Sequence, residues 1–367
     1  MKTLSKLTAL AMAAVMALSL TACTVGGDTG GPTQTSPTPS QSGGTQGNSP
    51  APSASQPAED ASYLVGICKL APHDALDAAT QGFKDAITAA LGDAVAFKEG
   101  NAGGESNNCA TIIDGFLAEN VDLILANATA SLQAAASATN TVPVLGTAVT
   151  NYGIALDLDS TEDGVLGGNI SGTSDLAPLD QQADLLEELF PAADYPSVGL
   201  LYCSAEPNSI FQVETIQGYL EDMGYTCSTY AFTDVNDLSS VTQSACDSSD
   251  VIYIPTDNTA ANNTETIANV VIPAGVPVVA GESGICSGCG VATLSIDYYE
   301  LGQITGEMAA RILTGEEDVS EMAIEYDTTL TKLYNPDNCE ALGITPPDNA
   351  EEGKKKQLSL GVLPDGD

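Results

Sequence analysis

Basic side chains are scarce in this sequence, where ten lysines and arginines stand against 49 aspartates and glutamates and give a formal charge of −39. Five of the ten lie near the two ends of the chain, which leaves five for the rest. Proteins that bind nucleic acid neutralise its phosphates with Lys and Arg, so we expect no nucleic-acid partner and no phosphorylated ligand. An acidic chain suits neutral or zwitterionic small molecules, whose carboxylate would have to be held mostly by backbone N–H groups and hydroxyls.

Histidine is nearly absent as well, since His73 is the one histidine of the sequence. A single CxxC motif, between Cys286 and Cys289, therefore has no second CxxC and no His pair to complete a metal site. A Ser-His-Asp triad would have to use His73, but no G-x-S-x-G elbow accompanies it. We expect no metal, no cofactor and no catalysis, and an extracellular hydrolase remains only as an alternative.

Nine cysteines are present, and the even number left after Cys23 permits disulfides in an exported protein, although their connectivity cannot be deduced from sequence. Gly288 and Gly290 place the CxxC motif in a loop that leads into a strand, which favours a short local disulfide or plain thiols over a thioredoxin-like role. The eight remaining cysteines are Cys68, Cys109, Cys203, Cys227, Cys246, Cys286, Cys289 and Cys339.

The apolar run over residues 7–20 is shorter than the roughly 20 residues that a membrane-spanning helix needs. It follows Lys2 and Lys6 and ends in Leu20-Thr21-Ala22-Cys23, an arrangement typical of a secretory signal. Because the signal ends in a cysteine, it resembles the lipobox of bacterial lipoproteins. The resemblance implies removal of residues 1–22 and acylation of Cys23, with chains such as palmitate holding the protein on the outside of the cell membrane.

The composition then changes twice along the chain. Residues 23–60 are almost wholly Gly, Ser, Thr, Pro and Gln, which predicts a flexible lipid-anchored linker. Residues 61–345 carry all the periodic segments, and their length suits two domains. Residues 346–367 are predicted to be a flexible tail.

Strands and helices alternate in the body of the chain, and they do so twice. Short apolar runs predict strands at residues 63–68, 94–98, 123–126 and 142–145, and again at 198–202, 226–231, 251–254 and 277–280. A helical stripe follows the first strand, with apolar residues at Leu76, Ala79, Phe83, Ile87 and Ala90. The predicted fold class is α/β, with two Rossmann-like, doubly wound parallel-sheet lobes.

The two halves also resemble each other in detail. Gln81-Gly82-Phe83 on the first helix corresponds to Gln217-Gly218-Tyr219 in the second half, and Asp122 and Asp250 open corresponding strands. Two such lobes in one exported chain predict a bilobed clamp. Ligands of parallel sheets bind outside the carboxyl ends of the strands, so the strand-to-helix loops are the candidate site.

Five segments of these loops and hinges occur in the order found in one protein family: APHDALD (71–77), GTSDL (172–176), SAEPNS (204–209), YIPTDNT (253–259) and IDYYELG (296–302). They resemble the ABC-transporter substrate-binding family that includes the tryptophan- and tyrosine-uptake lipoproteins. The resemblance covers essentially the whole folded body and implies the type I periplasmic-binding fold, in which three crossovers join two lobes that close on a ligand.

On that fold, the N-terminal lobe would take residues 61–168 and 295–314, and the C-terminal lobe residues 169–294 and 315–345. The hinges would lie near residues 167–168, 295–296 and 315–316. The crossover helix near residues 299–313 would pack through a stripe formed by Leu301, Ile304, Met308 and Ile312.

Candidate ligand contacts follow the predicted strands in both lobes. Free N–H groups where a strand ends and a helix begins suit a carboxylate, although Thr129 or Ser131 would also serve as a plain helix cap. Asp257 is the candidate for a ligand ammonium, with an N-cap as its alternative role and Glu282 as the second candidate. The full set of predicted contacts is His73, Asp74, Asn127, Thr129, Ser131, Thr147, Glu206, Asn208, Thr256, Asp257 and Glu282.

The predicted function is a monomeric extracytoplasmic solute receptor that closes on a small molecule and delivers it to ABC permease subunits. The resemblance favours an aromatic amino acid as the ligand. A ligand sensor of the same fold, acting on a signalling partner, is the alternative next to the hydrolase.

Overall fold

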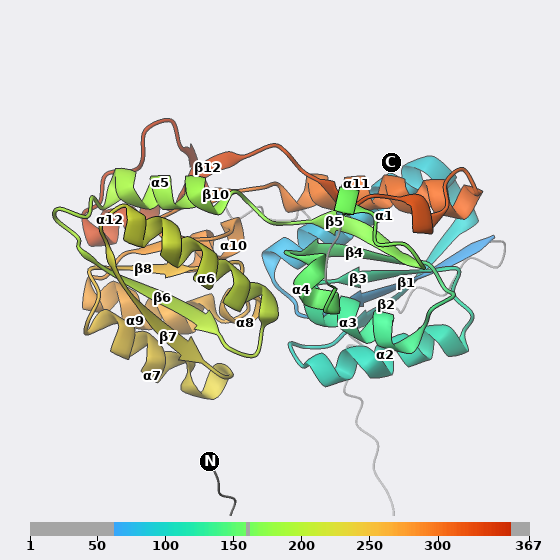
Figure 1. Ribbon diagram of the computed structural model, residues 1–367, viewed down its shortest axis with the longest axis horizontal. Coiled ribbons are helices and arrows are strands. Elements are labelled where there is room, and N and C mark those ends of the chain that lie inside the picture. The colour runs from blue at the N-terminus through green and yellow to red at the C-terminus, as the bar shows by residue number, and fades with distance from the viewer. Residues whose placement is uncertain (1–61, 159–161, 354–367) are drawn as a thin grey trace, which may run out of the picture. The chain divides into compact units, whose positions relative to one another are not determined.

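A computed structural model describes residues 62–158 and 162–353, which all belong to one compact unit of residues 55–367. This unit contains two α/β lobes, each built on its own sheet (Figure 1). The predicted signal at residues 1–22, the predicted acylation site Cys23 and the predicted linker at residues 23–60 lie outside the described residues. None of the helices in the described ranges is long and apolar enough to cross a bilayer.

The first sheet has six strands in the order β11-β5-β4-β3-β1-β2, all parallel. Its strands are β1 (Tyr63–Lys69), β2 (Val95–Asn101), β3 (Leu123–Asn127), β4 (Val144–Val149), β5 (Ile170–Ser174) and β11 (Glu325–Tyr326). Every residue of β3 and β4 is buried, as expected of central parallel strands that are covered on both faces.

The second sheet has seven strands in the order β13-β12-β10-β9-β8-β6-β7, with β12 antiparallel to β10 and the other pairs parallel. Its strands are β6 (Ser197–Cys203), β7 (Thr226–Phe232), β8 (Val251–Ile254), β9 (Val278–Ala280), β10 (Ala292–Ser295), β12 (Thr331–Tyr334) and β13 (Glu351–Glu352).

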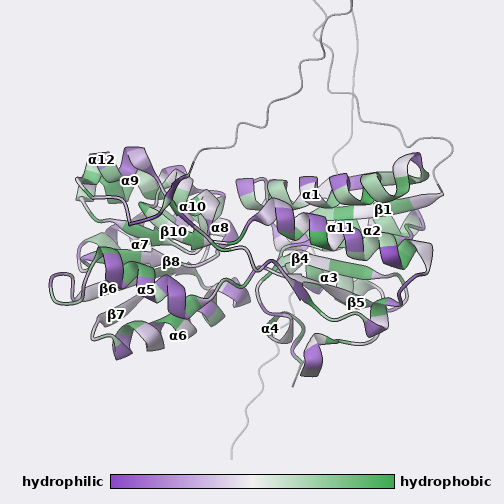
Figure 2. Ribbon diagram, turned by 90° about the horizontal axis from the view of Figure 1, so that it is seen from above, coloured by the Kyte–Doolittle hydropathy of each residue, from purple (hydrophilic) through white to green (hydrophobic). Residues whose placement is uncertain are grey.

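Helices cover both faces of each sheet, and the strands alternate accordingly. In β3, Leu123 and Leu125 pack with residues of α1 and α11, whereas Ile124 and Ala126 pack with residues of α2 and α3. The strands are coloured mostly as hydrophobic in Figure 2. The two-sided burial confirms the predicted doubly wound fold class.

The helices of the first lobe are α1 (Asp74–Leu91), α2 (Ser106–Ala118), α3 (Thr129–Ala138), α4 (Tyr152–Leu156) and α11 (Tyr298–Thr314). Those of the second lobe are α5 (Leu179–Leu189), α6 (Pro207–Asp222), α7 (Val235–Cys246), α8 (Asn258–Ala261), α9 (Thr264–Ala274), α10 (Ser283–Gly288) and α12 (Pro336–Leu342). Short 3₁₀ helices span Gly92–Ala94, Glu162–Gly164 and Val319–Glu321.

Helices α1 and α11 cross at very short range because glycines stand at the crossing. A Cβ atom at Gly82 would lie 2.0 Å from the carbonyl oxygen of Tyr299, and one at Gly302 would lie 2.1 Å from that of Ala79. The predicted stripe of α1 holds except at its last position, since Ala90 is exposed. Helix α11, which follows the second crossover, is thereby fixed to the first lobe.

Two predicted lobe boundaries are wrong. Residues 169–294 were assigned to the C-terminal lobe, but β5 pairs with β4, so the chain leaves the first sheet only after Ser174. Residues 315–345 were also assigned there, but β11 pairs with β5 in the first sheet. The predicted hinges near residues 167–168 and 315–316 are turns that lead into β5 and β11, both strands of the first sheet. The second lobe also extends beyond residue 345, since β13 pairs with β12.

The CxxC motif is not in a loop either. Cys286 lies within α10 and Cys289 ends that helix, and the eight cysteines of the described chain are free thiols. The motif therefore sits at the end of a short helix, away from the helix start at which a thioredoxin-like thiol is activated.

Candidate functional site

The loops at the carboxyl ends of the strands of both sheets meet around one pocket, termed here the inner pocket. Its free space is about 280 Å³, including space open to solvent. From the first lobe and its crossovers it is lined by His73, Ala75, Leu76, Ala148, Thr150, Asp175 and Tyr298. From the second lobe it is lined by Asn208, Thr256, Asp257, Asn258, Ala261 and Glu282.

Three carboxylates reach this pocket, and its described lining residues include no Lys or Arg. Asp175, Asp257 and Glu282 are only 3%, 1% and 2% exposed. Burial raises the pKa of Asp257 to about 7 and the pKa of Glu282 to about 7, and it also raises the pKa of Asp175. Asp257 and Glu282 are therefore only partly ionised at neutral pH, and a cation bound in the inner pocket would favour their charged forms.

Two of these carboxylates cap helices of the second lobe. Asp257 accepts hydrogen bonds from the backbone N–H groups of Ala260 at 2.8 Å and Cys203 at 2.7 Å. Glu282 accepts from those of Gly284 at 2.6 Å and Ile285 at 2.5 Å. The N-cap role, the alternative considered for Asp257, is thus the role that its hydrogen bonds perform, and each carboxylate lines the pocket from a fixed position.

Asp175 differs from these two because one of its oxygens is free. Its Oδ2 accepts a hydrogen bond from the hydroxyl of Tyr298 at 2.9 Å, whereas its buried Oδ1 has no hydrogen-bond partner among the described residues. The side chain of Thr150 lies near this carboxylate and partly offsets the rise in its pKa. It does not make a well-formed hydrogen bond to Oδ1. A buried carboxylate oxygen without a donor is costly, so Oδ1 is the atom of this pocket most in need of a ligand.

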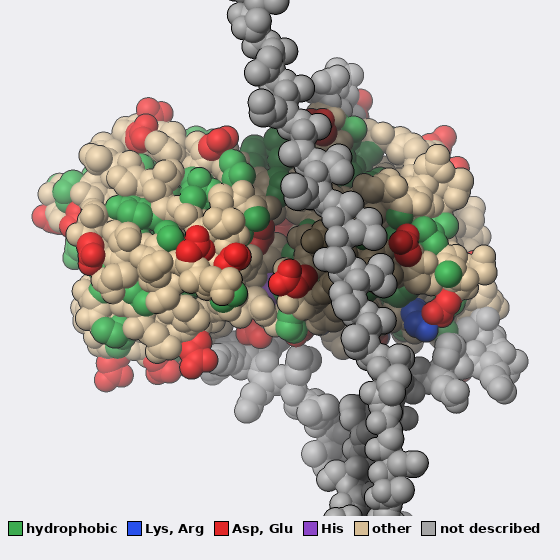
Figure 3. Space-filling view, turned by 90° about the horizontal axis from the view of Figure 1, so that it is seen from below, with side chains coloured by type: hydrophobic (Ala, Val, Ile, Leu, Met, Phe, Trp, Pro, Cys, Tyr) green, Lys and Arg blue, Asp and Glu red, His purple; other side chains and the backbone are tan. Residues whose placement is uncertain are grey.

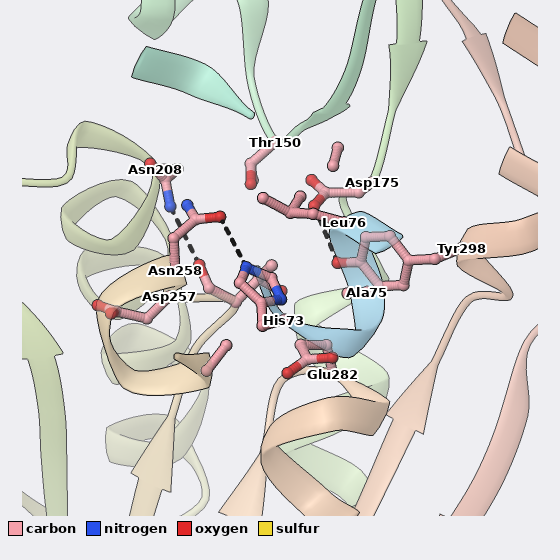
Figure 4. Close-up of a pocket in the computed structure, with 13 residues that line it drawn as sticks. His73, Ala75, Leu76, Thr150, Asp175, Asn208, Asp257, Asn258, Glu282 and Tyr298 are labelled. Atoms are coloured by element: carbon pink, nitrogen blue, oxygen red, sulfur yellow. Dashed lines mark hydrogen bonds between the residues drawn. The ribbon is translucent and has the colours of Figure 1, made fainter. Parts of the chain in front are cut away.

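His73 joins the two lobes across the pocket. Its Nε2 lies 3.3 Å from Oδ1 of Asn258, the first residue of α8, and its buried Nδ1 has no partner in the described ranges. Burial lowers the pKa of His73, which keeps the imidazole neutral at neutral pH. In Figure 4 this pair lies between Asn208 on one side and the hydrogen-bonded Asp175 and Tyr298 on the other, with Glu282 below.

The N-terminus of α1 also faces the inner pocket. His73 is its N-cap residue but provides no side-chain hydrogen bond to the first turn, and Ala75 and Leu76 of that turn line the pocket. Uncapped N–H groups and the helix dipole favour an anionic group here. The pocket therefore offers a negative region around Asp175 and an anion-favouring region at the start of α1, an arrangement that matches a zwitterion.

The backbone at the end of β4 is irregular where it meets the pocket. Ala148 has a φ of 52°, a left-handed conformation that is uncommon for a residue with a side chain, and the pairing of β4 with β5 shifts at this point. Strain of this kind is concentrated at functional sites. The bulge brings Ala148 and Thr150 to the pocket wall.

A second, wider cavity opens beside the inner pocket and is termed here the outer cleft. It holds about 1210 Å³ of space, including open solvent, and is lined from the first lobe by Thr129 and the loop before α2 and from the second lobe by Glu206 and Asn208. Glu206 accepts hydrogen bonds from the backbone and side chains of Asn258 and Thr259, at 2.7–3.0 Å. Its carboxylate is thus occupied in holding the start of α8.

Several predicted contacts lie elsewhere. Asn127 donates to the carbonyl of Leu76 and the hydroxyl of Thr80, both at 2.9 Å, and is fully buried in the first lobe. Ser131 and Thr147 are also fully buried there. All three lie outside the linings of both cavities, and in this structure they hold strands and helices together. Asp74 starts α1 but is exposed and lines neither cavity.

The remaining predictions divide between the two cavities. His73, Thr256, Asp257 and Glu282 line the inner pocket, Thr129 and Glu206 the outer cleft, and Asn208 both. Asp175 and Tyr298 are not among the predicted contacts, although both residues lie within the segments that resemble the family.

The raised pKa values of the buried carboxyls predict how stability changes with pH. Between the unfolded pKa, about 4, and the folded pKa, about 7, the folded state binds more protons than the unfolded state. The free energy of unfolding must therefore fall as pH rises through that window. Urea titrations of the ligand-free protein should give a lower midpoint at pH 8 than at pH 6.

Surface repulsion acts in the same direction in so acidic a chain, so the measurement needs 1 M salt, where the Debye length is about 3 Å. Asp257→Asn retains a good N-cap and should reduce the pH dependence. A pH dependence that disappears in salt, or that Asp257→Asn leaves unchanged, would contradict the raised pKa of Asp257.

The matched model of the family described as "ABC transporter substrate binding protein" spans residues 64–355. The chain belongs to this family. The family predicted from the five segments is therefore confirmed, and it is a family of extracytoplasmic substrate-binding proteins.

Known relatives of this substrate-binding protein agree with its fold. A "Tyrosine-binding protein" of Clostridioides difficile is 30% identical over 286 residues, which cover 76% of this chain and 81% of the relative. The structure of an ABC domain in complex with L-Trp, from Streptococcus pneumoniae, has a TM-score of 0.75 at 28% identity and covers 80% of this chain and 99% of that one.

A ligand-free, open structure of a Clostridium difficile substrate-binding protein with adhesive properties has a TM-score of 0.61 at 32% identity, covering 80% of this chain and all of that one. The likeness to these solved structures confirms the predicted type I periplasmic-binding fold.

Proposed function

We propose that this substrate-binding protein captures an aromatic amino acid in its inner pocket. The observation that carries the proposal is the set of three buried carboxylates with no Lys or Arg among the described lining residues, next to the uncapped start of α1. A ligand with an ammonium and a carboxylate supplies both missing charges. The acidic surface in Figure 3, where Lys or Arg side chains are visible at one place only, fits a cationic or zwitterionic ligand rather than an anionic one.

The ammonium would donate to Oδ1 of Asp175, since that oxygen is buried without a donor in the described structure. The carboxylate would face the first turn of α1, where the hydroxyl of Thr150 and the amide of Asn208 also reach the pocket. Leu76, Ala148 and Tyr298 offer apolar surface for a ring, whose burial supplies roughly 2–3 kcal/mol.

The relatives support the aromatic class. One curated relative carries the name tyrosine-binding protein, and one similar structure contains L-Trp. This chain also has a higher TM-score with the tryptophan complex than with the open, ligand-free structure, although its identity to the latter is slightly greater. The His73–Asn258 contact between the lobes supports hinge closure over the ligand.

We further propose that Cys23 is acylated and holds a monomeric receptor on the outer face of a bacterial membrane, where it delivers its ligand to an ABC permease. The segment Leu20-Thr21-Ala22-Cys23 and the polar linker after it support the anchor. A sensor of the same fold remains the alternative, and the identity of the neighbouring genes would separate the two.

A thermal-shift panel tests the ligand class. Tryptophan, tyrosine and phenylalanine should stabilise the protein, by about 2.7 kcal/mol for a ligand at 100 times its dissociation constant. Indole-3-propionate, which matches tryptophan but lacks the ammonium, and tryptamine, which lacks the carboxylate, should bind much more weakly. If a sugar or a nucleoside stabilises the protein while all three aromatic amino acids fail, the ligand assignment is wrong and the receptor class stands.

A further inference from the structure

Two thiols of the first lobe meet at one hydroxyl. Cys68 lies near the end of β1 and Cys109 lies in the first turns of α2, and both are fully buried. The Sγ atom of Cys68 lies 3.7 Å, and that of Cys109 3.5 Å, from the same Oγ of Ser131. Residues 41 positions apart in sequence thus place two sulfur atoms around a single oxygen, inside the lobe core.

Other buried thiols of the described chain are placed differently. Cys203, Cys289 and Cys339 each donate to a backbone carbonyl oxygen at 3.5–3.6 Å. The pKa of Cys289 is raised by burial, so this thiol stays protonated. At Cys109, by contrast, hydrogen bonding from Cys68 and from Ser131 lowers the pKa to about 7, while the pKa of Cys68 is raised. One thiol of the pair is therefore the better nucleophile at neutral pH, and the other stays protonated beside it.

We propose that Cys68 and Cys109 form a redox modification site, at which a small peroxide links them as a disulfide outside the cytoplasm. The Cys109 sulfur attacks one oxygen of hydrogen peroxide, the O–O bond breaks, and the other oxygen leaves as water after taking a proton. The sulfur of Cys68 then attacks the sulfenic sulfur of Cys109, the S–O bond breaks, and a second water leaves. Two thiols and one hydrogen peroxide become one disulfide and two waters.

The outer cleft is lined by residues that lie next to the pair in sequence. Ser106 and Asn107, just before Cys109 in α2, line that cavity, as does Leu70, two residues after Cys68. Hydrogen peroxide is little larger than water, whereas a bulky disulfide reagent would require the lobe to open. The site should therefore react with peroxide and resist large oxidants.

The disulfide would change stability more than binding. It would close a loop of about 40 residues and fasten β1 to α2, which constrains the unfolded chain. Neither cysteine lines the inner pocket. We expect the unfolding temperature to rise by several degrees on oxidation, and the affinity for tryptophan to change by less than about threefold.

The test is a peptide map of the fully reduced, full-length protein after limited hydrogen peroxide and alkylation of the remaining thiols. The first cross-linked peptide should join Cys68 to Cys109, with a mass lower by two hydrogens. The CxxC pair, Cys286 and Cys289, is an internal control that should react later. A first cross-link at the CxxC pair, or overoxidised Cys109 without any cross-link, would overturn the proposal.

Variants separate the chemistry from folding. Cys68→Ala should leave Cys109 as a sulfenic acid that dimedone traps, whereas Cys109→Ala should leave Cys68 unmodified at the same dose. The control Cys227→Ala removes a half-buried thiol of the second lobe and should leave the Cys68–Cys109 cross-link unchanged. Equal peroxide reactivity of Cys68 in the Cys109→Ala variant would contradict the assigned roles, and the wild-type map decides the outcome if a variant fails to fold.

Discussion

Asp175→Asn should weaken the binding of tryptophan or tyrosine by roughly 30-fold to several thousand-fold, which corresponds to 2–5 kcal/mol. The substitution keeps the shape of the side chain and an oxygen that accepts from Tyr298, but it removes the charge that would pair with the ligand ammonium. Because Asp175 is only 3% exposed, solvent cannot replace that charge. Calorimetry of the two proteins measures the difference directly.

Asp180→Asn is the matched control for this change. Asp180 lies five residues further along, in the first turn of α5, and is exposed. The same loss of one negative charge should there leave the affinity within about threefold. If Asp175→Asn also binds within threefold of the wild-type protein, the ammonium is held elsewhere, and Glu282 becomes the residue to test.

Gly302→Val should destabilise the protein by at least about 3 kcal/mol, at the upper end of the effects of overpacking. Its Cβ would meet the backbone of Ala79 in α1 at 2.1 Å, and a backbone carbonyl in a buried helix cannot move aside as a flexible side chain would. The two helices would have to separate, which opens the core of the first lobe. Urea unfolding followed by circular dichroism measures the loss.

Gly218→Val in α6 controls for the helix propensity of valine. No atom lies within 4 Å of a Cβ built there, and valine is slightly better than glycine in a helix, so this variant should be neutral or slightly stabilising. Equal destabilisation by the two substitutions would show that the α1–α11 crossing is not under the packing constraint inferred for it.

The fold could be predicted because its information is local. A strand is predicted directly by an apolar run such as residues 251–254, and a helix by a stripe such as Leu76, Phe83 and Ile87. Both elements are present where they were expected. The lobe boundaries could not be read in the same way. Gly167 and Gly168 indicate a turn, but a turn into β5 and a hinge between lobes have the same local sequence, and only the pairing of β5 with β4 distinguishes them.

The sequence was sufficient to predict which loops form the site, but not which of their side chains line it. Every strand-to-helix loop contains polar residues, and sequence does not tell which of them turn into the cleft. Thr147 turns into a buried network with Thr173 and Thr305, whereas Thr150, three residues later, reaches the inner pocket after a bulge in β4. Asp175 and Tyr298 meet across two crossovers, a contact between residues 123 positions apart that no local pattern encodes.

Fluorescence offers the most direct test of the central claim, since the chain has 12 tyrosines and no tryptophan. Tyr298 lines the inner pocket, so tryptophan bound there should accept energy from it and emit at a wavelength shifted to the blue by the dry surroundings. Excitation of tyrosine during a titration with tryptophan should yield this emission, saturating with micromolar or tighter affinity, about −8 kcal/mol or more favourable. Tryptophan emission that stays identical to that of the free amino acid, with no saturation up to about 100 micromolar, would contradict the assignment of an aromatic amino acid to the inner pocket.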